Sequence, residues 1–314
     1  PLNEQKRIIS KIEELLSRID SAKQLLESIH LQLELYKASL LKSAFEGKLT
    51  EKWRHTNDVV NSVSELLEQN KKNSKYKIEL NSLPAIPKIW AWVNFDQILN
   101  DKKNAMKAGP FGSSLKKEFY VPDGYKIYGQ EQVIRGDPEY GNYFIDEKRF
   151  QLLKTNEVKA GDLLISLVGT VGKTLILPDG IKKGIINPRL IKISLDKQMV
   201  DVKFIQIYFE SAPAKFYFKL ASHGGTMSIL NMGMLKKLPI PLPPLAEQEQ
   251  IMLEIEQGFS LIENTSHIVE STLQKLQTMK MSVLKKAFEG KLVPQDPNDE
   301  PASELLERIK AKQY

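Results

Sequence analysis

The sequence predicts an α+β protein in which a globular domain of mixed helices and strands is flanked by two long α-helices. Two observations lead to this fold class. A stretch of about fifty residues occurs twice, at a fixed offset of 243, with 22 of 50 positions identical. Between the two copies the helical spacing of apolar residues disappears, and short strand-like runs alternate with Gly, Pro and Asp turns.

The first copy predicts one helix over residues 4–45, ending before Gly47. Its apolar residues follow each other in steps of four and three, which is the spacing of a coiled-coil seam. The seam residues are Ile8, Ile12, Leu15, Ile19, Ala22, Leu26, Ile29, Leu33, Tyr36 and Leu40 in the first copy, and Ile251, Ile255, Gly258, Ile262, Thr265, Val269, Thr272, Leu276, Met279 and Val283 in the second. Equal length and register predict two rods of roughly 60 Å that lie against each other or against identical partners. Such a pair would act as a spacer of fixed length.

Changes in composition divide the chain into five parts. We expect a first long helix in residues 1–50, a connector in 51–87, a middle domain in 88–240, a second long helix in 241–292, and a tail with a short helix in 293–314. The run Ser64–Glu68 predicts a short helix in the connector, and the same five letters recur at Ser303–Glu307. The chain starts at Pro1 without a methionine, inside a motif whose second copy is preceded by Leu238–Pro243, so we expect it to be the remainder of a longer chain or a trimmed one.

The middle domain carries the β signals. Strand-like runs are found at residues 125–128, 163–166, 174–177 and 190–193, separated by turns such as 122–124 and 178–180. Residues 202–209 and 214–220 predict helices that are broken near Pro213.

Composition limits the class of protein. With 41% apolar and 8% aromatic residues, the chain can bury a core. The absence of cysteine excludes a disulfide framework and thiolate metal sites, and fits a reducing compartment. No apolar run reaches the length of a membrane span. We therefore expect a cytoplasmic protein without a membrane partner.

The positive charge is concentrated in the middle domain. Residues 88–240 hold 23 Lys and Arg against 15 Asp and Glu, a surplus of +8, whereas the whole chain has a net charge of +6. A basic domain between nearly neutral helices indicates a polyanionic ligand, most often nucleic acid. A basic surface that only confers solubility is the alternative.

Two motifs could indicate catalysis. The run Gly169–Thr174 ends like a phosphate-binding loop, but Leu167 stands where that pattern needs its first glycine. We therefore expect a tight turn between two strands, with Lys173 at its tip.

Asp179, Asp201 and Lys203 formally resemble a nuclease set that would place two carboxylates on Mg²⁺ and the lysine on phosphate. Asp179 lies in a Pro-Asp-Gly turn, and the four histidines are scattered without ligand spacing. We predict no catalytic residue, metal site or cofactor in this chain.

What remains is a set of polar loops suited to DNA. Gln, Asn and Arg can pair with base edges, while Lys, Ser and Thr suit phosphates. Ordinary solvated loops are the alternative for any single residue. The predicted DNA-binding residues are Ser113, Ser114, Lys116, Lys117, Gln130, Gln132, Arg135, Lys173, Asn187, Arg189, His223, Thr226 and Ser228.

The chain resembles the specificity subunit of a Type I restriction–modification system over essentially its whole length. The resemblance is carried by the junction 238–248, by the two Ala-Phe-Glu-Gly-Lys-Leu runs at 44–49 and 287–292, and by the tail 296–302. Trp90-x-Trp92-Val93 and the segments 109–115, 161–166 and 169–173 are also similar to landmarks of this family.

The resemblance implies two conserved helices packed antiparallel, with residues 88–240 as a target-recognition domain for one half of a bipartite site in double-stranded DNA. Methyltransferase subunits would dock on the helices, and a restriction and translocase subunit would join them. S-adenosylmethionine, ATP and Mg²⁺ would act on those partners. Because family members usually have two recognition domains, the chain would be either a fragment or a half-subunit that pairs with a second copy. An autonomous nuclease and a coiled-coil scaffold without base specificity are the competing hypotheses.

Overall fold

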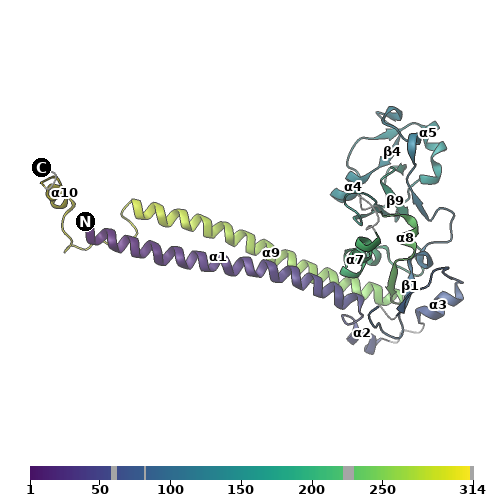
Figure 1. The fold of residues 1–314 in the computed structure, drawn as a ribbon, viewed down its shortest axis with the longest axis horizontal. Helices are drawn as coiled ribbons and strands as arrows, with labels where there is room; N and C mark the ends of the chain where they lie inside the picture. The colour runs from purple at the N-terminus through teal and green to yellow at the C-terminus, as the bar shows by residue number, and fades with distance from the viewer. Residues whose placement is uncertain (58–61, 81–82, 222–229, 312–314) are drawn as a thin grey trace. The chain divides into compact units, whose positions relative to one another are not determined.

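The repeat forms two helices of equal length in the computed structural model, which describes residues 1–57, 62–80, 83–221 and 230–311. Helix α1 spans Leu2–Phe45 and helix α9 spans Leu245–Phe288, with 44 residues in each (Figure 1). Both long helices predicted from the heptad spacing are therefore confirmed. None of the described helices combines the length and the hydropathy that a membrane-spanning segment requires.

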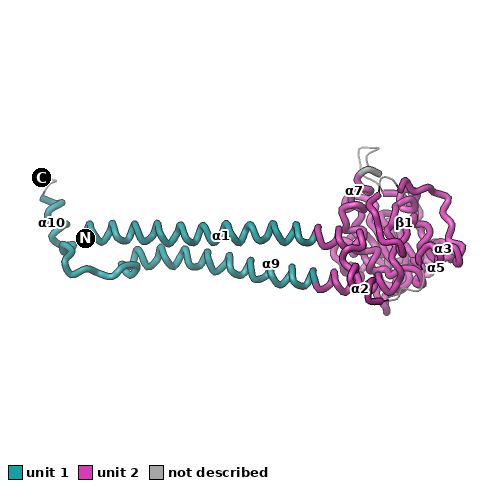
Figure 2. Tube along the Cα trace, turned by 90° about the horizontal axis from the view of Figure 1, so that it is seen from below, with its two compact units in different colours: residues 1–37, 258–314 teal, residues 38–257 magenta. Residues whose placement is uncertain are grey.

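The chain divides into two compact units (Figure 2). The first consists of residues 1–37 and 258–314. In it the segments of α1 and α9 lie side by side and antiparallel, because Asp20 pairs with Lys280 at 3.6 Å and Lys37 lies 4.8 Å from the ring centre of Phe259. The tail follows with helix α10 (Ala302–Ala311).

The predicted seam describes the buried face of the two helices with one exception in each. Its other members are buried or half-buried. Tyr36 and Met279, which occupy the same repeat position, are 44% and 54% exposed. In α1 the neighbouring Lys37, which is half-buried and lies over the ring of Phe259, occupies the buried face in place of Tyr36. A straight helix has 3.6 residues per turn and drifts against a strict seven-residue repeat, so one seam position turns outward.

The second unit, residues 38–257, contains the middle domain. The strands in its described residues form three sheets. One sheet has the order β2 (Met106–Ala108), β9 (Leu190–Ile193), β6 (Leu163–Ser166) and β7 (Thr174–Ile176). Another has the order β3 (Tyr120–Val121), β5 (Phe144–Ile145), β4 (Tyr125–Tyr128) and β8 (Gly184–Ile186), in which β4 and β8 are parallel.

The third sheet closes the middle domain where the chain enters and leaves it. Strand β1 (Ala91–Asn94) pairs antiparallel with β10 (Pro239–Leu242). Proline is tolerated in β10 because a two-stranded sheet leaves one side of each strand without a partner. The strand was not predicted, since Pro-Ile-Pro lacks the usual strand signals.

Short helices complete the unit. The α-helices are α2 (Glu51–Thr56), α3 (Val63–Gln69), α4 (Gln130–Arg135), α5 (Glu147–Leu152), α6 (Val202–Glu210), α7 (Ala212–Ala221) and α8 (Met232–Lys236). Single 3₁₀ turns are found at Phe95–Ile98, Gly112–Ser114, Lys117–Phe119 and Lys154–Asn156. Helix α3 begins with the capping box of Ser62 and Glu65, which explains why the connector supports a helix there.

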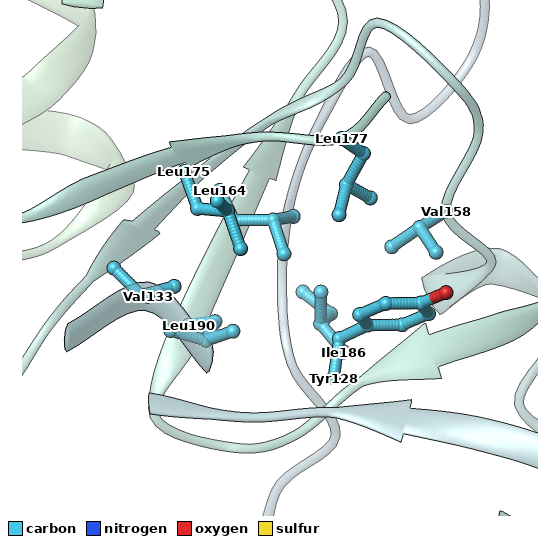
Figure 3. Close-up of a cluster of buried hydrophobic side chains, with 8 residues drawn as sticks. All are labelled: Tyr128, Val133, Val158, Leu164, Leu175, Leu177, Ile186 and Leu190. Carbon is cyan, nitrogen blue, oxygen red and sulfur yellow. The ribbon is translucent and has the colours of Figure 1, made fainter. Parts of the chain in front are cut away.

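One core cluster joins the two four-stranded sheets and helix α4. Figure 3 shows its buried side chains: Tyr128, Val133, Val158, Leu164, Leu175, Leu177, Ile186 and Leu190. Tyr128 donates its hydroxyl hydrogen to the carbonyl oxygen of Lys182 at 2.6 Å, so the ring can be buried with its polar group satisfied. This cluster fixes the strand ends from which the candidate site is built.

The long helices enter the second unit through buried aromatic and polar contacts. Phe45 lies at the end of α1, and its ring centre is 5.4 Å from that of Phe204 and 5.0 Å from that of Tyr208, both in α6. Glu247, in the first turn of α9, accepts hydrogen bonds from Thr50 (2.6 Å) and Trp90 (2.7 Å) and pairs with Arg54. The C-terminal end of α1 and the N-terminal end of α9 are therefore fixed to the middle domain.

Candidate nucleic-acid interface

Five of the predicted DNA-binding residues line one cavity of the middle domain. The cavity has a volume of about 610 Å³. The five residues are Lys117, Gln130, Gln132, Asn187 and Arg189. Tyr120, Tyr143 and Ile134 contribute apolar surface to the same wall. Cations, amides and aromatic rings are thus gathered in one concave site.

Parallel pairing of β4 and β8 explains why residues distant in sequence meet here. Ile127 is paired with Ile185 and Tyr128 with Ile186, so the two strands end at the same edge. Helix α4 begins just after β4, and the loop 187–189 follows β8. The backbone N–H of Asn187 donates to the carbonyl oxygen of Tyr128 at 2.8 Å, which continues the strand pairing into the loop.

Arg189 is presented to solvent by a local turn. The side-chain oxygen of Asn187 accepts a hydrogen bond from the Arg189 N–H at 2.9 Å, as in an Asx turn. The guanidinium is exposed, and in the described part of the chain no carboxylate forms an ion pair with it. Its donors are therefore available for a bidentate contact with a guanine edge or a phosphate.

Gln130 connects α4 to the turn between β6 and β7. Its amide nitrogen donates to Ser166 Oγ at 3.0 Å, to Thr170 Oγ1 at 3.2 Å and to the carbonyl oxygen of Val168. A base contact by Gln130, as predicted, would therefore use the side-chain oxygen, or it would require the nitrogen to break its hydrogen bonds to this turn.

Gln132 lies inside the domain. It is 1% exposed; its side-chain oxygen accepts from the Gly129 N–H at 2.9 Å and its nitrogen donates to the carbonyl oxygen of Tyr140 at 2.8 Å. A direct base contact would break these bonds, so the structure gives Gln132 a positioning role. Arg135 stacks on the ring of Tyr140, 4.1 Å from its centre.

The structure distributes the predicted phosphate-binding residues over a wider area. Ser113, Lys116 and Lys173 are exposed but outside the cavity lining, and Lys116 lies 3.2 Å from Glu118. Ser114 is half-buried, and its carbonyl oxygen accepts from Arg149 at 3.5 Å. His223, Thr226 and Ser228 lie outside the described residues.

A buried lysine that sequence reasoning missed supports the cavity wall. Lys126 donates through Nζ to the carbonyl oxygens of Glu139 at 2.8 Å and Gly141 at 3.2 Å. These bonds hold the segment that leads to Tyr143. Burial lowers the pKa of Lys126, while the nearby Glu139 carboxylate opposes this shift. Alternation in β4 places this lysine at a position where a polar side chain would normally face solvent, so the sequence gives no signal for it.

Two of the three residues of the nuclease-like set, Asp201 and Lys203, have structural contacts. The turn 167–173 joins β6 to β7, as expected. Asp201 caps helix α6 by accepting from the Lys203 N–H at 2.6 Å, and Lys203 lies 3.6 Å from Glu256. Asp179 is exposed. Within the described residues, no group of three or more metal-binding side chains comes together.

The fold and the site define a protein with an α+β domain, in which amides, an arginine and a lysine line one cavity, and with two long repeated helices. The family described as Type I restriction modification DNA specificity domain matches residues 111–274, which is more than half of the chain. The chain belongs to this family.

Curated relatives match almost the whole chain. It is 27% identical to the EcoBI specificity subunit of Escherichia coli over 99% of this chain and 63% of that protein. It is also 27% identical to the EcoKI specificity subunit of Escherichia coli strain K12, over 99% of this chain and 62% of that protein. The chain therefore spans less than two thirds of the length of these relatives.

Solved structures share the fold. A chain from a study of complex assembly and conformational transition of the type I R-M system matches with a TM-score of 0.61 and 17% identity, over 93% of this chain and 60% of the other. The HsdS subunit from Thermoanaerobacter tengcongensis matches with a TM-score of 0.53 and 19% identity, over 93% of this chain and 60% of the other.

Proposed function

We propose that this chain is a sequence-specific DNA-recognition subunit of a Type I restriction–modification complex and that it acts in the cytoplasm. The middle domain reads one half of a bipartite target. The observation that carries this proposal is the convergence of Arg189, Asn187 and Lys117 on one cavity of a domain with a surplus charge of +8. Methyl transfer and cleavage, with S-adenosylmethionine, ATP and Mg²⁺, belong to partner subunits.

Affinity and specificity come from different groups in this proposal. Exposed lysines such as Lys116 and Lys117 neutralise phosphates, which gives binding that is sensitive to salt and blind to sequence. Arg189 and Asn187 contact base edges, where one well-placed bidentate contact discriminates by about 1–3 kcal/mol. The buried Gln132 and Lys126 hold the cavity wall in place.

The outer ends of the repeat supply the docking site for a second recognition domain. In the second unit, Phe45 is 4% exposed and Glu247 is fully buried against the middle domain. Their repeat equivalents in the first unit are Phe288, which is 92% exposed, and Glu4, which is only half-buried. The residues that are buried against the middle domain in the second unit thus have identical equivalents in the first unit that are exposed or half-buried. A second copy of the chain in this role would form a two-fold dimer and give a palindromic target.

Methyltransferase subunits dock on the long helices α1 and α9. Leu25 and Ile268 occupy the same repeat position and are both exposed apolar residues. Two equivalent apolar positions on a two-fold repeat suit two copies of one partner. Replacing both by serine should prevent assembly with the methyltransferase, while the same change at Leu31, which has a glutamine as its repeat equivalent, should have little effect.

Methylome mapping in cells that carry this chain with its methyltransferase tests the main proposal. We expect methylation at one bipartite sequence, and specific binding of the purified complex to a duplex with that sequence. Binding without sequence preference would favour the scaffold hypothesis. Nicking of DNA by the purified chain with Mg²⁺ would favour the nuclease hypothesis. Light scattering of the chain alone tests whether it pairs with a second copy. A strict monomer at high concentration would contradict pairing and favour the hypothesis that the second recognition domain belongs to a longer chain.

A further inference from the structure

One exposed aromatic side chain lies among the predicted DNA-binding loops. Phe111 is 73% exposed, although the three residues before it, Ala108 to Pro110, are all buried. The exposed ring therefore emerges directly from an anchored stretch of backbone.

The anchoring ties Phe111 to the loop that carries Arg189. The Gly109 N–H donates to the carbonyl oxygen of Leu190 at 2.9 Å. A Cβ atom added to Gly109 would lie 1.8 Å from the carbonyl oxygen of Asn187, so only glycine allows this approach. On the other side, Asn156 donates to the carbonyl oxygen of Ala108 at 2.7 Å. The start of the Phe111 loop and the Arg189 loop are thus held as one piece.

The surroundings of Phe111 favour nucleic acid over protein as its ligand. Gly112, Ser113 and Ser114 follow it, and then the exposed Lys116 and Lys117. The core of a protein interface is depleted of charged residues and enriched in several apolar ones. An exposed aromatic ring beside hydroxyls and cations is instead typical of side chains that stack on bases, because DNA offers ring faces flanked by phosphates.

We propose that Phe111 stacks against a base step of the bound half-site and partly unstacks it. The inference rests on the proposed function of the middle domain. Every base has a ring face, so the contact adds affinity without reading the sequence. Arg189 and Asn187, fixed to the same piece of backbone, then meet base edges at a set distance from the disturbed step.

The experiment uses the complex of this chain with its methyltransferase and duplexes that carry the mapped target, with 2-aminopurine at successive positions of the half-site. We expect Phe111→Ala to weaken binding of target and scrambled duplexes alike by roughly five- to 150-fold, the range that base–aromatic stacking supports. It should also remove the 2-aminopurine fluorescence that reports unstacking. Phe111→Trp should restore both. Phe216→Ala, at an exposed phenylalanine of α7, is the matched control and should change neither.

The outcomes separate this inference from the proposal on which it rests. A wild-type complex that binds target and scrambled duplexes equally would contradict the proposed function itself. Specific binding by the wild type, together with unchanged binding and fluorescence for Phe111→Ala, would overturn only the stacking role. Failure of Phe111→Ala to assemble with the methyltransferase, with DNA binding by the free chain unchanged, would overturn it too and assign Phe111 to a protein contact.

Discussion

Trp90 and Glu247 are joined by a hydrogen bond of 2.7 Å, from the indole N–H to the carboxylate, although 157 residues separate them in the chain. Trp90 immediately precedes the first strand of the middle domain, and Glu247 lies in the first turn of α9. The bond therefore ties the start of the domain to the helix that leaves it, next to the paired strands β1 and β10. Arg54 and Thr50 meet the same carboxylate, which makes Glu247 the common acceptor of three side chains from two segments of the chain.

The first prediction concerns this buried carboxylate. Glu247→Ala removes the carboxylate that pairs with the Arg54 guanidinium and accepts from the Trp90 N–H, and breaking such a buried ion pair costs about 3–5 kcal/mol. We expect the free energy of unfolding of the second unit to fall by that amount in urea titrations. Glu4→Ala removes the identical repeat residue and is the control. A comparable decrease in both variants would show that the contacts of Glu247 are not the cause.

A second matched pair tests the docking site at the ends of the repeat. Phe45→Ala opens a cavity against Phe204 and Tyr208, which should cost about 3–5 kcal/mol of stability. Phe288→Ala should leave the unfolding of the isolated chain unchanged, because its ring is already in water. In a preparation that contains a second recognition domain, Phe288→Ala should weaken that association, measured by light scattering. Unchanged association would contradict the proposed docking site.

The third prediction separates phosphate contacts from base contacts. Replacing Lys116 and Lys117 by alanine should weaken binding to all sequences alike and lower the slope of log K against log salt by about 0.9 for each phosphate that is no longer neutralised. Arg189→Ala should instead relax the choice of base at one position, by about 1–3 kcal/mol. Selection of bound sequences from randomised DNA measures both effects. Unchanged preferences in Arg189→Ala would remove this residue from the base contacts.

Gln130 and Gln132 should behave differently from Arg189 in the same selection. Gln132→Ala leaves the Gly129 N–H and the Tyr140 carbonyl oxygen unpaired in the interior, so it should lower the stability of the domain by about 1–3 kcal/mol. Gln130→Ala should relax base preference, as predicted from the sequence, and also loosen the β6–β7 turn. Thermal unfolding distinguishes the two effects. A fully stable Gln132→Ala variant with altered preference would place Gln132 at the DNA.

The fifth prediction is a pH dependence that arises from Lys126. Burial and the nearby Lys182 lower its pKa, while Glu139 and Asp137 raise it, and the net shift is downward from the ordinary lysine value. In the window between the lowered pKa and about 10.4, the unfolded chain binds more protons than the folded one. Stability should therefore rise with pH through this window. Lys126→Met should reduce this rise in urea titrations, whereas Lys183→Met, at an exposed site, should retain it.

How far the sequence predicted this structure depends on how local each feature is. The strands β4, β6 and β9 coincide with their predicted runs, because each run carries its own apolar pattern. The pairing of β1 with β10 was missed, since its partners are far apart and one contains two prolines. Gln132 has the sequence context of a surface residue, yet it is buried by a loop that its own amide holds.

The sequence by itself determined the two long helices, their common register, the basic middle domain and the family, because periodicity, repetition and composition are written in the order of residues. Only the tertiary structure decided which polar residues meet. The parallel pairing of β4 with β8 brings Gln130 and Arg189 to one cavity, and the burial of Phe45 against the exposure of Phe288 distinguishes two otherwise identical ends. Both outcomes depend on contacts between distant segments, which no local pattern specifies.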